Sequence, residues 1–274
     1  MLVFVAAEAR EFDGFLANAE RVVKLNWPLS FARIVWLNGR AALLVANGPG
    51  PKLAGMALEV VRERKDLQRL NVNLELTGLA STGFCGALDP ALEPCDIFVA
   101  TQLLVVAGGP LPDGRGSVTP PPTSNIPNAP KPNRDRKGTV ATTVHECSPI
   151  TATRKYKSGK LLSMDRVAST AAEKSELRKT GADAVEMEAG AVAAKAKEWN
   201  LPFYAIRVVT DTATESFPLD FNRMRDADGR FDRAKIITAA LRRPGVIFPE
   251  LLRLNKRCKS AAKALGEFIA NCRI

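Results

Sequence analysis

Three carboxylates stand at the ends of predicted strands within one segment, Ala182–Asp211. Glu186 and Glu188 alternate with apolar residues, so both project to the same side of an extended chain. An alanine-rich helix follows, and the apolar run Phe203–Val209 predicts a buried strand that finishes at Asp211. Acidic side chains at the carboxyl end of such a strand lie where open α/β sheets bind their ligands. The segment is therefore a candidate active site on one β-α-β unit.

Two glycine-rich turns add backbone groups to this candidate site. Asn47–Gly50 follows a predicted strand and precedes a predicted helix, and residues 81–86 end another strand. The N–H groups of a strand-to-helix turn can bind an anion at the N-terminus of the helix. Many such turns bind nothing, so both interpretations stay open for Gly48 and its neighbours.

The elements that must position these residues alternate between strand and helix. Leu2–Ala7 predicts a first strand and Glu8–Val22 a first helix, and Asn38-Gly39-Arg40 predicts a hairpin between the next two strands. We expect a single α/β domain over residues 1–274, with three α/β/α layers around a mixed, largely parallel sheet. Residues 108–138 are rich in proline and predict a long loop within this domain.

The C-terminal segment 230–274 is predicted to be helical and basic. Its apolar stripe can pack on the sheet with the basic side chains in solvent, or its basic face can touch an anionic membrane. The basic residues of this segment include Arg253, Lys256, Arg257, Lys259 and Lys263.

Composition limits the classes of partner and cofactor. A net charge of +10 requires an anionic partner or serves solubility alone. One histidine and five scattered cysteines without a CxxC pair argue against a metal site and a disulfide framework, so we expect no metal or cofactor and a cytoplasmic location. No apolar run approaches the roughly 18 residues of a membrane span. The basic residues are not interleaved with aromatic ones, so nucleic acid is not the expected partner.

Four blocks of sequence carry a resemblance to a known family. They are the opening strand with Glu11, the turn Asn47–Gly50, Thr82–Gly86 with the later Asp96–Val99, and Val185–Ala189 with Arg207–Asp211. Together they resemble the nucleoside phosphorylase and nucleosidase superfamily, of the purine phosphorylase and methylthioadenosine nucleosidase type. The resemblance implies an enzyme that cleaves the N-glycosidic bond of a purine nucleoside, and a homo-oligomer.

Later blocks resemble a narrower branch, the hopanoid-associated phosphorylases. These blocks are Ser163–Ala168, Glu173-Lys174, Phe217-Pro218 and Leu241–Pro244. Members of that branch are linked to the removal of adenine from adenosylhopane in hopanoid synthesis. The branch implies a large apolar 5′ substituent on the nucleoside and contact with the inner membrane. A methylthioadenosine/S-adenosylhomocysteine-type nucleosidase is the alternative.

The resemblance assigns roles to the carboxylates. Asp211 would give a proton to purine N7, which requires a raised pKa that burial can provide. Glu188 would accept hydrogen bonds from the ribose hydroxyls, with Met187 against the sugar and Glu186 also facing the pocket. Without the resemblance, Asp211 is a turn residue and Met187 packs in the core. Arg207, in mid-strand among apolar residues, cannot be buried unpaired, so we expect it to pair with a site carboxylate.

Other matched positions would bind base and sugar. Thr82, Gly83, Phe84 and Cys85 would present the turn to the substrate. Val167 stands where related nucleosidases carry an aromatic residue that stacks on adenine, which puts the base preference in question.

The nucleophile is open between water and phosphate. In nucleosidases of this superfamily a glutamate near the first strand activates water, and Glu11 is in register for that role. In phosphorylases, arginines and a serine of the glycine-rich turn hold phosphate. Phe84 replaces that serine here, yet Arg10, Arg40 and Gly48 remain candidate phosphate ligands. The departures at Phe84 and Val167 also keep open a different class of function, a catalytically weakened protein that binds nucleosides or nucleic acid.

Overall fold

The computed structural model describes residues 1–63, 75–106 and 142–274, so the predicted loop at 108–138 lies outside the described residues. One sheet has the strand order β10-β9-β6-β11-β5-β1-β4-β3-β2, with β7 beside β6. Its strands are β1 (Leu2–Ala6), β2 (Arg21–Lys24), β3 (Phe31–Leu37), β4 (Arg40–Ala46), β5 (Gly78–Ala87), β6 (Ile97–Val106), β7 (Thr142–Glu146), β9 (Lys157–Ser163), β10 (Ala184–Glu186) and β11 (Phe203–Asp211). A small second sheet pairs β8 (Thr151–Ala152) with β12 (Cys272–Arg273).

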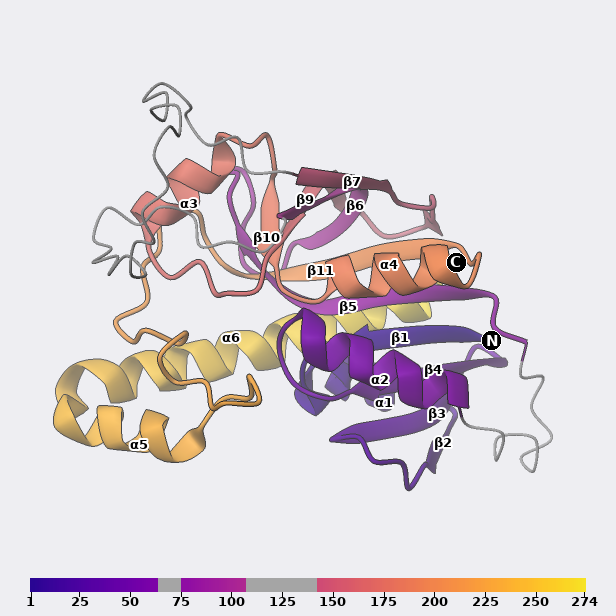
Figure 1. Cartoon of the computed structure of the whole chain (residues 1–274), viewed down its shortest axis with the longest axis horizontal. Helices are drawn as coiled ribbons and strands as arrows, with labels where there is room; N and C mark the ends of the chain where they lie inside the picture. The colour runs from indigo at the N-terminus through magenta and orange to yellow at the C-terminus, as the bar shows by residue number, and fades with distance from the viewer. Residues whose placement is uncertain (64–74, 107–141) are drawn as a thin grey trace, which may run out of the picture.

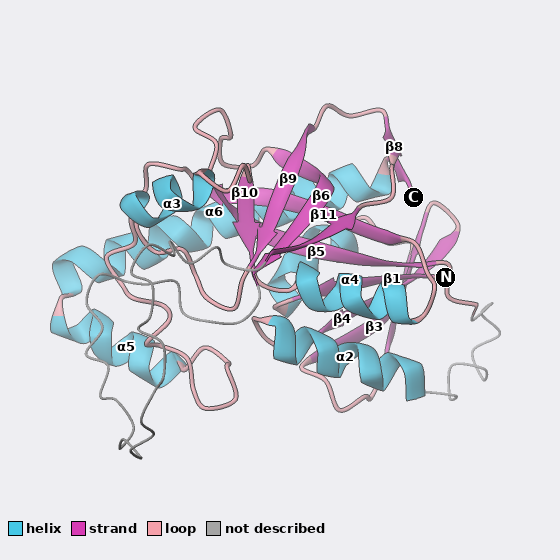
Figure 2. Cartoon of the chain, turned by 45° about the horizontal axis from the view of Figure 1, so that its top comes forward, coloured by secondary structure: helices cyan, strands magenta, loops and turns pink. Residues whose placement is uncertain are grey.

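Helices cover both faces of the large sheet, as the alternation of elements predicted. One face carries α2 (Pro51–Glu63) and α4 (Ala189–Glu198), whose alanine, leucine and valine side chains join the buried side chains of β1 and β11. The other face carries α1 (Asp13–Ala17) and α6 (Pro244–Ala270) (Figure 1, Figure 2). Strands covered on both faces must be apolar along their whole length, which is why β1 and β11 lack alternation.

Parallel pairing brings the polar ends of the central strands to one edge of the sheet. Strands β4, β1, β5 and β11 are neighbours and run parallel, so their carboxyl ends lie together. The register places Arg207 beside Gly83 and Asp211 beside Gly86. The pairing shifts between Val209 and Asp211, and such bulges change the direction of a side chain next to many active sites.

Strand β10 closes part of the sheet on itself. It pairs in parallel with β9 and antiparallel with the last residues of β5, so β5, β11, β6, β9 and β10 form a ring. The closure brings Glu186, the last residue of β10, to the same edge as Asp211.

The first predicted helix was wrong in extent. A 3-10 turn η1 (Ala9–Phe12) leads into α1, which ends at Ala17, and β2 follows instead of further helix. The β-branched Val22 and Val23 suit a strand, and they pair with β3. Between Thr170 and Lys179 lies the short helix α3 (Ala171–Arg178).

The basic segment at 230–274 contains α5 (Arg233–Arg242) and the long helix α6. Across residues 1–63, 75–106 and 142–274, none of the helices is both long and apolar enough to cross a membrane.

Two glycines let α6 and α1 meet at backbone distance. A Cβ on Gly266 would lie 2.0 Å from the carbonyl carbon of Gly14, and a Cβ on Gly14 would lie 2.0 Å from the carbonyl oxygen of Ala262. Because both nearest atoms belong to the backbone, no side-chain rotation can relieve the overlap. The contact fixes α6 against the segment that follows β1.

We predict that Gly266→Ala lowers the free energy of unfolding by about 1–3 kcal/mol, because the added methyl forces α1 and α6 apart. Gly55→Ala is the matched control, since Gly55 lies inside α2 with open space around its Cβ position. It should raise helix stability by up to about 1 kcal/mol. Denaturant unfolding of both variants checks this, and equal effects of the two changes would contradict the close contact.

Candidate active site

A cavity of about 460 Å³ opens at the edge where the carboxylates gather. This volume is within the range of small-molecule sites. One part of its wall is acidic, with Glu11, Glu186, Glu188 and Asp211. Three arginines also line it, Arg10, Arg166 and Arg233. Much of the remainder is apolar and comes from Phe84, Val167, Met187, Phe217, Phe221, Phe231, Ile236, Leu251 and Leu254.

A fully buried guanidinium stands behind the acidic wall. Arg207 of β11 donates hydrogen bonds to the carboxylate of Glu186, the hydroxyl of Ser81 and the carbonyl of Thr82, and its Nη1 lies 3.5 Å from Glu188 Oε2. Burying such a cation costs several kcal/mol unless it is paired and hydrogen-bonded. The structure therefore pairs Arg207 with site carboxylates, as its position in the strand required.

Glu186 borders the cavity, as expected, but its carboxylate is used inside the protein. Its carboxylate is held by Arg207 and also accepts the backbone N–H groups of Glu188 and Ala189, where α4 begins. These donors are among those that a helix N-terminus leaves without an intrahelical partner. Although Glu186 borders the cavity, its side chain serves to fix Arg207 and α4 rather than to present a free carboxylate.

Glu188 lines the cavity and makes fewer contacts within the protein than Glu186. Its Oε1 accepts the N–H of Gly50 at 2.9 Å, so the Asn47–Gly50 turn orients it. Burial first, and then the nearby charge of Glu186, raises the pKa of Glu188 to about 8, while Arg207 acts in the opposite direction. Because this pKa lies near neutral pH, a cation placed beside Glu188 readily shifts its carboxyl group to the ionised form.

Glu11 is oriented by two backbone donors. It accepts the N–H of Glu8 at 2.8 Å and the N–H of Phe84 at 2.8 Å. Gly83 makes this possible, because its φ is +120° and a Cβ there would lie 2.4 Å from Glu11 Oε1. Burial raises the pKa of Glu11 against the effect of these hydrogen bonds.

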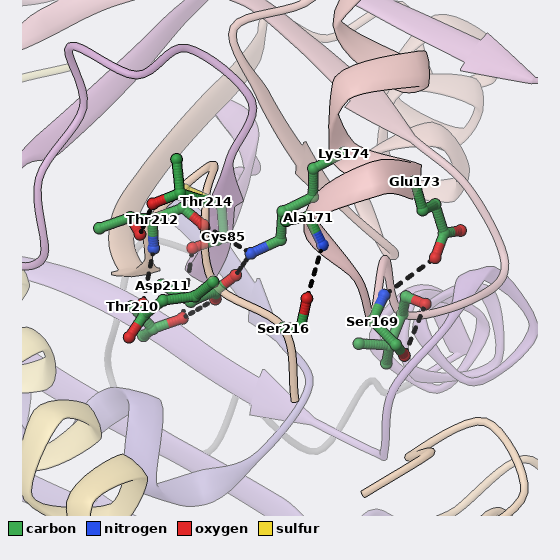
Figure 3. Close-up of polar contacts among 12 residues, drawn as sticks. Cys85, Ser169, Ala171, Glu173, Lys174, Thr210, Asp211, Thr212, Thr214 and Ser216 are labelled. Carbon is green, nitrogen blue, oxygen red and sulfur yellow. Dashed lines mark hydrogen bonds and ion pairs between the residues drawn. The ribbon is translucent and has the colours of Figure 1, made fainter. Parts of the chain in front are cut away.

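Asp211 is paired with a buried lysine from α3. Figure 3 shows Lys174 extended toward Asp211 and the carbonyl of Thr212, at Nζ–O distances of 2.5 and 2.7 Å. Thr210 donates to the other carboxylate oxygen at 2.8 Å. Burial raises the pKa of Asp211, and the charge of Lys174 opposes that rise. Asp211 lines the cavity, whereas its partner Lys174 is fully buried and is not part of the cavity wall.

Sequence reasoning did not identify Lys174 as a site residue. It placed this residue in a short charged helix, where lysines are normally solvated. The available signal was its spacing of three from Leu177, which puts both side chains on the buried face of α3. The phenylalanines at 217, 221 and 231, whose rings contact one another in sequence, were also missed.

Residues 81–86, predicted to form a glycine-rich turn, lie instead within β5. Those expected to bind base and sugar lie at or behind the cavity. Phe84 and Cys85 line it, Thr82 is buried behind it, and the Cys85 thiol has a pKa raised by burial. Val167 lines the cavity and is fixed through its backbone by Asn222, which accepts its N–H at 2.8 Å and donates to its carbonyl at 2.9 Å.

The candidate phosphate ligands are not brought together. The N–H of Gly48 donates to the carbonyl of Ala7, Pro49 has no N–H, and the N–H of Gly50 binds Glu188. Arg40 begins β4 and is therefore at the opposite end of that strand from the cavity. Arg10 does line the cavity, where it pairs with Glu8 at 2.7 Å. Of the three candidates, only Arg10 is placed to meet a ligand.

No group of three or more histidine, cysteine, aspartate or glutamate side chains in the described ranges could hold a metal ion.

Comparison with known proteins adds the family. The sequence model of the phosphorylase superfamily matches residues 5–242. The chain belongs to this superfamily. The predicted superfamily, the α/β fold and the prediction of an enzyme are thereby confirmed. A search of curated proteins finds no match.

Solved structures of low identity share the fold of this superfamily member. The 5′-methylthioadenosine/S-adenosylhomocysteine nucleosidase from Neisseria meningitidis, in complex with methylthio-immucillin-A, has a TM-score of 0.62 at 18% identity. The alignment covers 98% of this chain and 96% of that one. A putative nucleosidase of the same type from Borrelia burgdorferi, bound to adenine, has a TM-score of 0.61 at 14% identity, with 99% and 98% covered.

The raised pKa of Glu188 predicts a dependence of stability on pH. Because the pKa rises from 4.5 to about 8 on folding, the folded state holds this proton more tightly than the unfolded state. The stabilisation is complete below pH 4.5 and is lost as the pH rises toward 8. We expect the thermal midpoint of the Glu188→Gln variant to fall less steeply over this window. The raised pKa values of Glu11 and Asp211 affect the unaltered protein and the variant alike. Parallel curves of thermal midpoint against pH for the two proteins would therefore contradict the assignment to Glu188.

Proposed function

We propose that this protein cleaves the N-glycosidic bond of a purine nucleoside, with water as the nucleophile. One observation carries the proposal. The same cavity is lined by Asp211, which is ion-paired to the buried Lys174, by the buried Glu188 and by a Glu11 that backbone donors orient. Cleavage of this bond needs a proton for the departing base, an anion near the ribosyl cation and a base for the attacking water.

Each group then has one task. As the C1′–N9 bond breaks, its electron pair stays on the base, and one proton of the ion-paired Lys174 and Asp211 moves to N7. Glu188 in its ionised form lies beside the ribose and stabilises the oxocarbenium charge. Water bonds to C1′ and gives its proton to Glu11. The protons balance, because the pair loses one and Glu11 gains one.

Hydrolysis is favoured over phosphorolysis by the placement of the anion ligands. The backbone donors of Gly48 and Gly50 are used within the protein, and Arg40 is remote from the cavity. Glu11 needs no further group to act on water. Phosphate bound through the arginines that line the cavity, Arg10, Arg166 and Arg233, is the alternative that the assay below tests.

The apolar wall supports a nucleoside with an apolar 5′ substituent. The edge-to-face phenylalanines at 217, 221 and 231 and the leucines at 251 and 254 supply more apolar surface than a ribose hydroxyl needs. Removal of adenine from adenosylhopane, implied by the hopanoid branch, fits this wall. Methylthioadenosine is the smaller alternative, and the Neisseria structure holds an inhibitor that carries the methylthio name. The homo-oligomer and the cytoplasmic location implied above stay predictions.

The first test is base release from adenosine, inosine, methylthioadenosine and an adenosine with a bulky apolar 5′ group, each with and without phosphate. We expect release without phosphate and the highest kcat/KM for the bulky substrate. A requirement for phosphate would overturn hydrolysis. No release from any substrate would favour the nucleoside-binding protein of another class.

The second test separates proton donation from other roles of the Lys174–Asp211 pair. Asp211→Asn and Lys174→Met should lower kcat for adenosine cleavage by on the order of 10²–10⁴-fold, the usual contribution of general acid catalysis. Cleavage of para-nitrophenyl riboside should fall much less, because that leaving group departs without a proton. Lys174→Arg, which keeps the charge, is the matched control and should recover part of the loss. Equal losses for both substrates would show that the pair acts only in binding or folding.

A further inference from the structure

Helix α5 and the first half of α6 form a hairpin that extends beyond the sheet (Figure 1). Every residue of α5 is at least partly exposed, although the helix is ten residues long. A helix that buries no side chain in its own chain gains little from packing, since most helical stability in proteins comes from a buried apolar face. Its sequence must therefore suit a different environment.

The exposed face of this hairpin is unusually apolar. Five of the nine exposed large hydrophobic side chains in the described ranges lie between residues 237 and 252, and the other four are scattered. Contiguous patches of this kind mark contact sites, whereas single exposed side chains are ordinary. The five, with their exposed fractions, are Ile237 (60%), Leu241 (75%), Val246 (58%), Phe248 (57%) and Leu252 (55%).

Uncompensated positive charge lies at the turn of the hairpin. Arg242 ends α5 and Arg243 precedes α6, and neither makes an ion pair within the described part of the chain. The arginines singled out in the sequence are different, because Arg253 and Arg257 are neutralised by Glu215, and Arg253 also by Glu250. Unpaired positive charge therefore lies at the outer end of the hairpin, between the exposed side chains of Leu241 and Val246.

We propose that the tip of the α5–α6 hairpin docks on an anionic lipid surface. Apolar side chains that flank a pair of arginines suit the surface of a bilayer. The apolar side chains enter the acyl region, and the arginines contact the headgroups. Each arginine near such a surface adds attraction that falls off within a Debye length. Leu241, Val246 and Phe248 are the inserting residues, and Arg242 and Arg243 the headgroup contacts.

Charge argues against a second copy of this chain as the occupant. A twofold contact whose axis passes through the tip would set the Arg242–Arg243 pair of one protomer near the same pair of its partner. Like charges brought together in an interface oppose binding. An anionic surface supplies the opposite sign, and the net charge of +10 adds to its attraction.

The docking surface is continuous with the wall of the cavity. Ile236 and Leu251 line the cavity, while the adjacent Ile237 and Leu252 are exposed on the hairpin. Docking would thus place the apolar side of the cavity next to the bilayer, where a nucleoside with a lipid-like 5′ group would reside. This consequence rests on the proposed function, whereas the docking itself does not.

The test is co-sedimentation of the full chain with phosphatidylcholine vesicles, with and without phosphatidylglycerol, at low and high salt. We expect binding to the phosphatidylglycerol vesicles that weakens as salt is added. Absence of binding at low salt, or equal binding to both vesicle types, would overturn the proposal.

Two sets of variants locate the contact. Leu241→Ser/Val246→Ser/Phe248→Ser should lower the vesicle affinity on the order of a hundredfold, from the apolar area no longer inserted. Arg242→Gln/Arg243→Gln should lower it by about fivefold per arginine at low salt. The matched controls change exposed residues elsewhere, Met56→Ser/Val144→Ser and Lys24→Gln/Lys197→Gln, and should bind as the unaltered protein does. Equal losses in the controls would contradict docking through the tip.

Two further measurements separate this proposal from its alternatives. Light scattering gives the mass of the unaltered protein and of the serine variant, and a smaller assembly for the variant would mean that a second copy covers the tip. Base release from a soluble nucleoside should be unchanged in the tip variants, since none of these residues lines the cavity. Loss of vesicle binding with retained turnover supports docking, and docking without any turnover would count against the proposed function alone.

Discussion

A guanidinium buried in the middle of a strand is the constraint on which the site depends. Arg207 has no exposed surface, so its charge must be met from inside the protein, and Glu186 and Glu188 meet it. Removing one partner of such a set leaves a buried charge unpaired, at a cost of about 3–5 kcal/mol. Glu186, which ends β10 and accepts the first N–H groups of α4, is fixed by this cation, while Glu188 is oriented jointly by Arg207 and the Gly50 N–H.

The same strand carries a second buried pair of opposite polarity. At its end, Asp211 faces the fully buried Lys174, so β11 holds a cation in its middle and an anion at its end. Buried pairs are seldom the most stabilising choice, since apolar residues of similar volume often do as well. Their presence beside a cavity agrees with a site whose buried charges serve its chemistry, while the surrounding apolar layers stabilise the fold.

The sequence was informative where one local pattern decides one local structure. The apolar run before Asp211 predicted a buried strand, and the helices on both faces followed from alternation. It failed where a contact joins distant segments. Nothing near Lys174 shows that α3 lies against the end of β11. Nothing near Gly48 shows that its N–H binds the carbonyl of Ala7. Glu186 and Glu188 look equivalent in an extended chain, and only the start of α4 separates their tasks.

Helix α6 connects three parts of the molecule as a single rod. Its 27 residues span about 40 Å, from the exposed hairpin, past Leu254 and Cys258 at the cavity, to the close contact with Gly14. Gly14 lies three residues after Glu11, so the contact holds α6 against the segment that carries Glu11. Pro249, near the outer end, lacks the N–H that would continue the hydrogen-bond ladder. The break in the ladder at Pro249 lies between the exposed tip and the residues at the cavity, so it is where the helix can bend without moving Leu254 and Cys258.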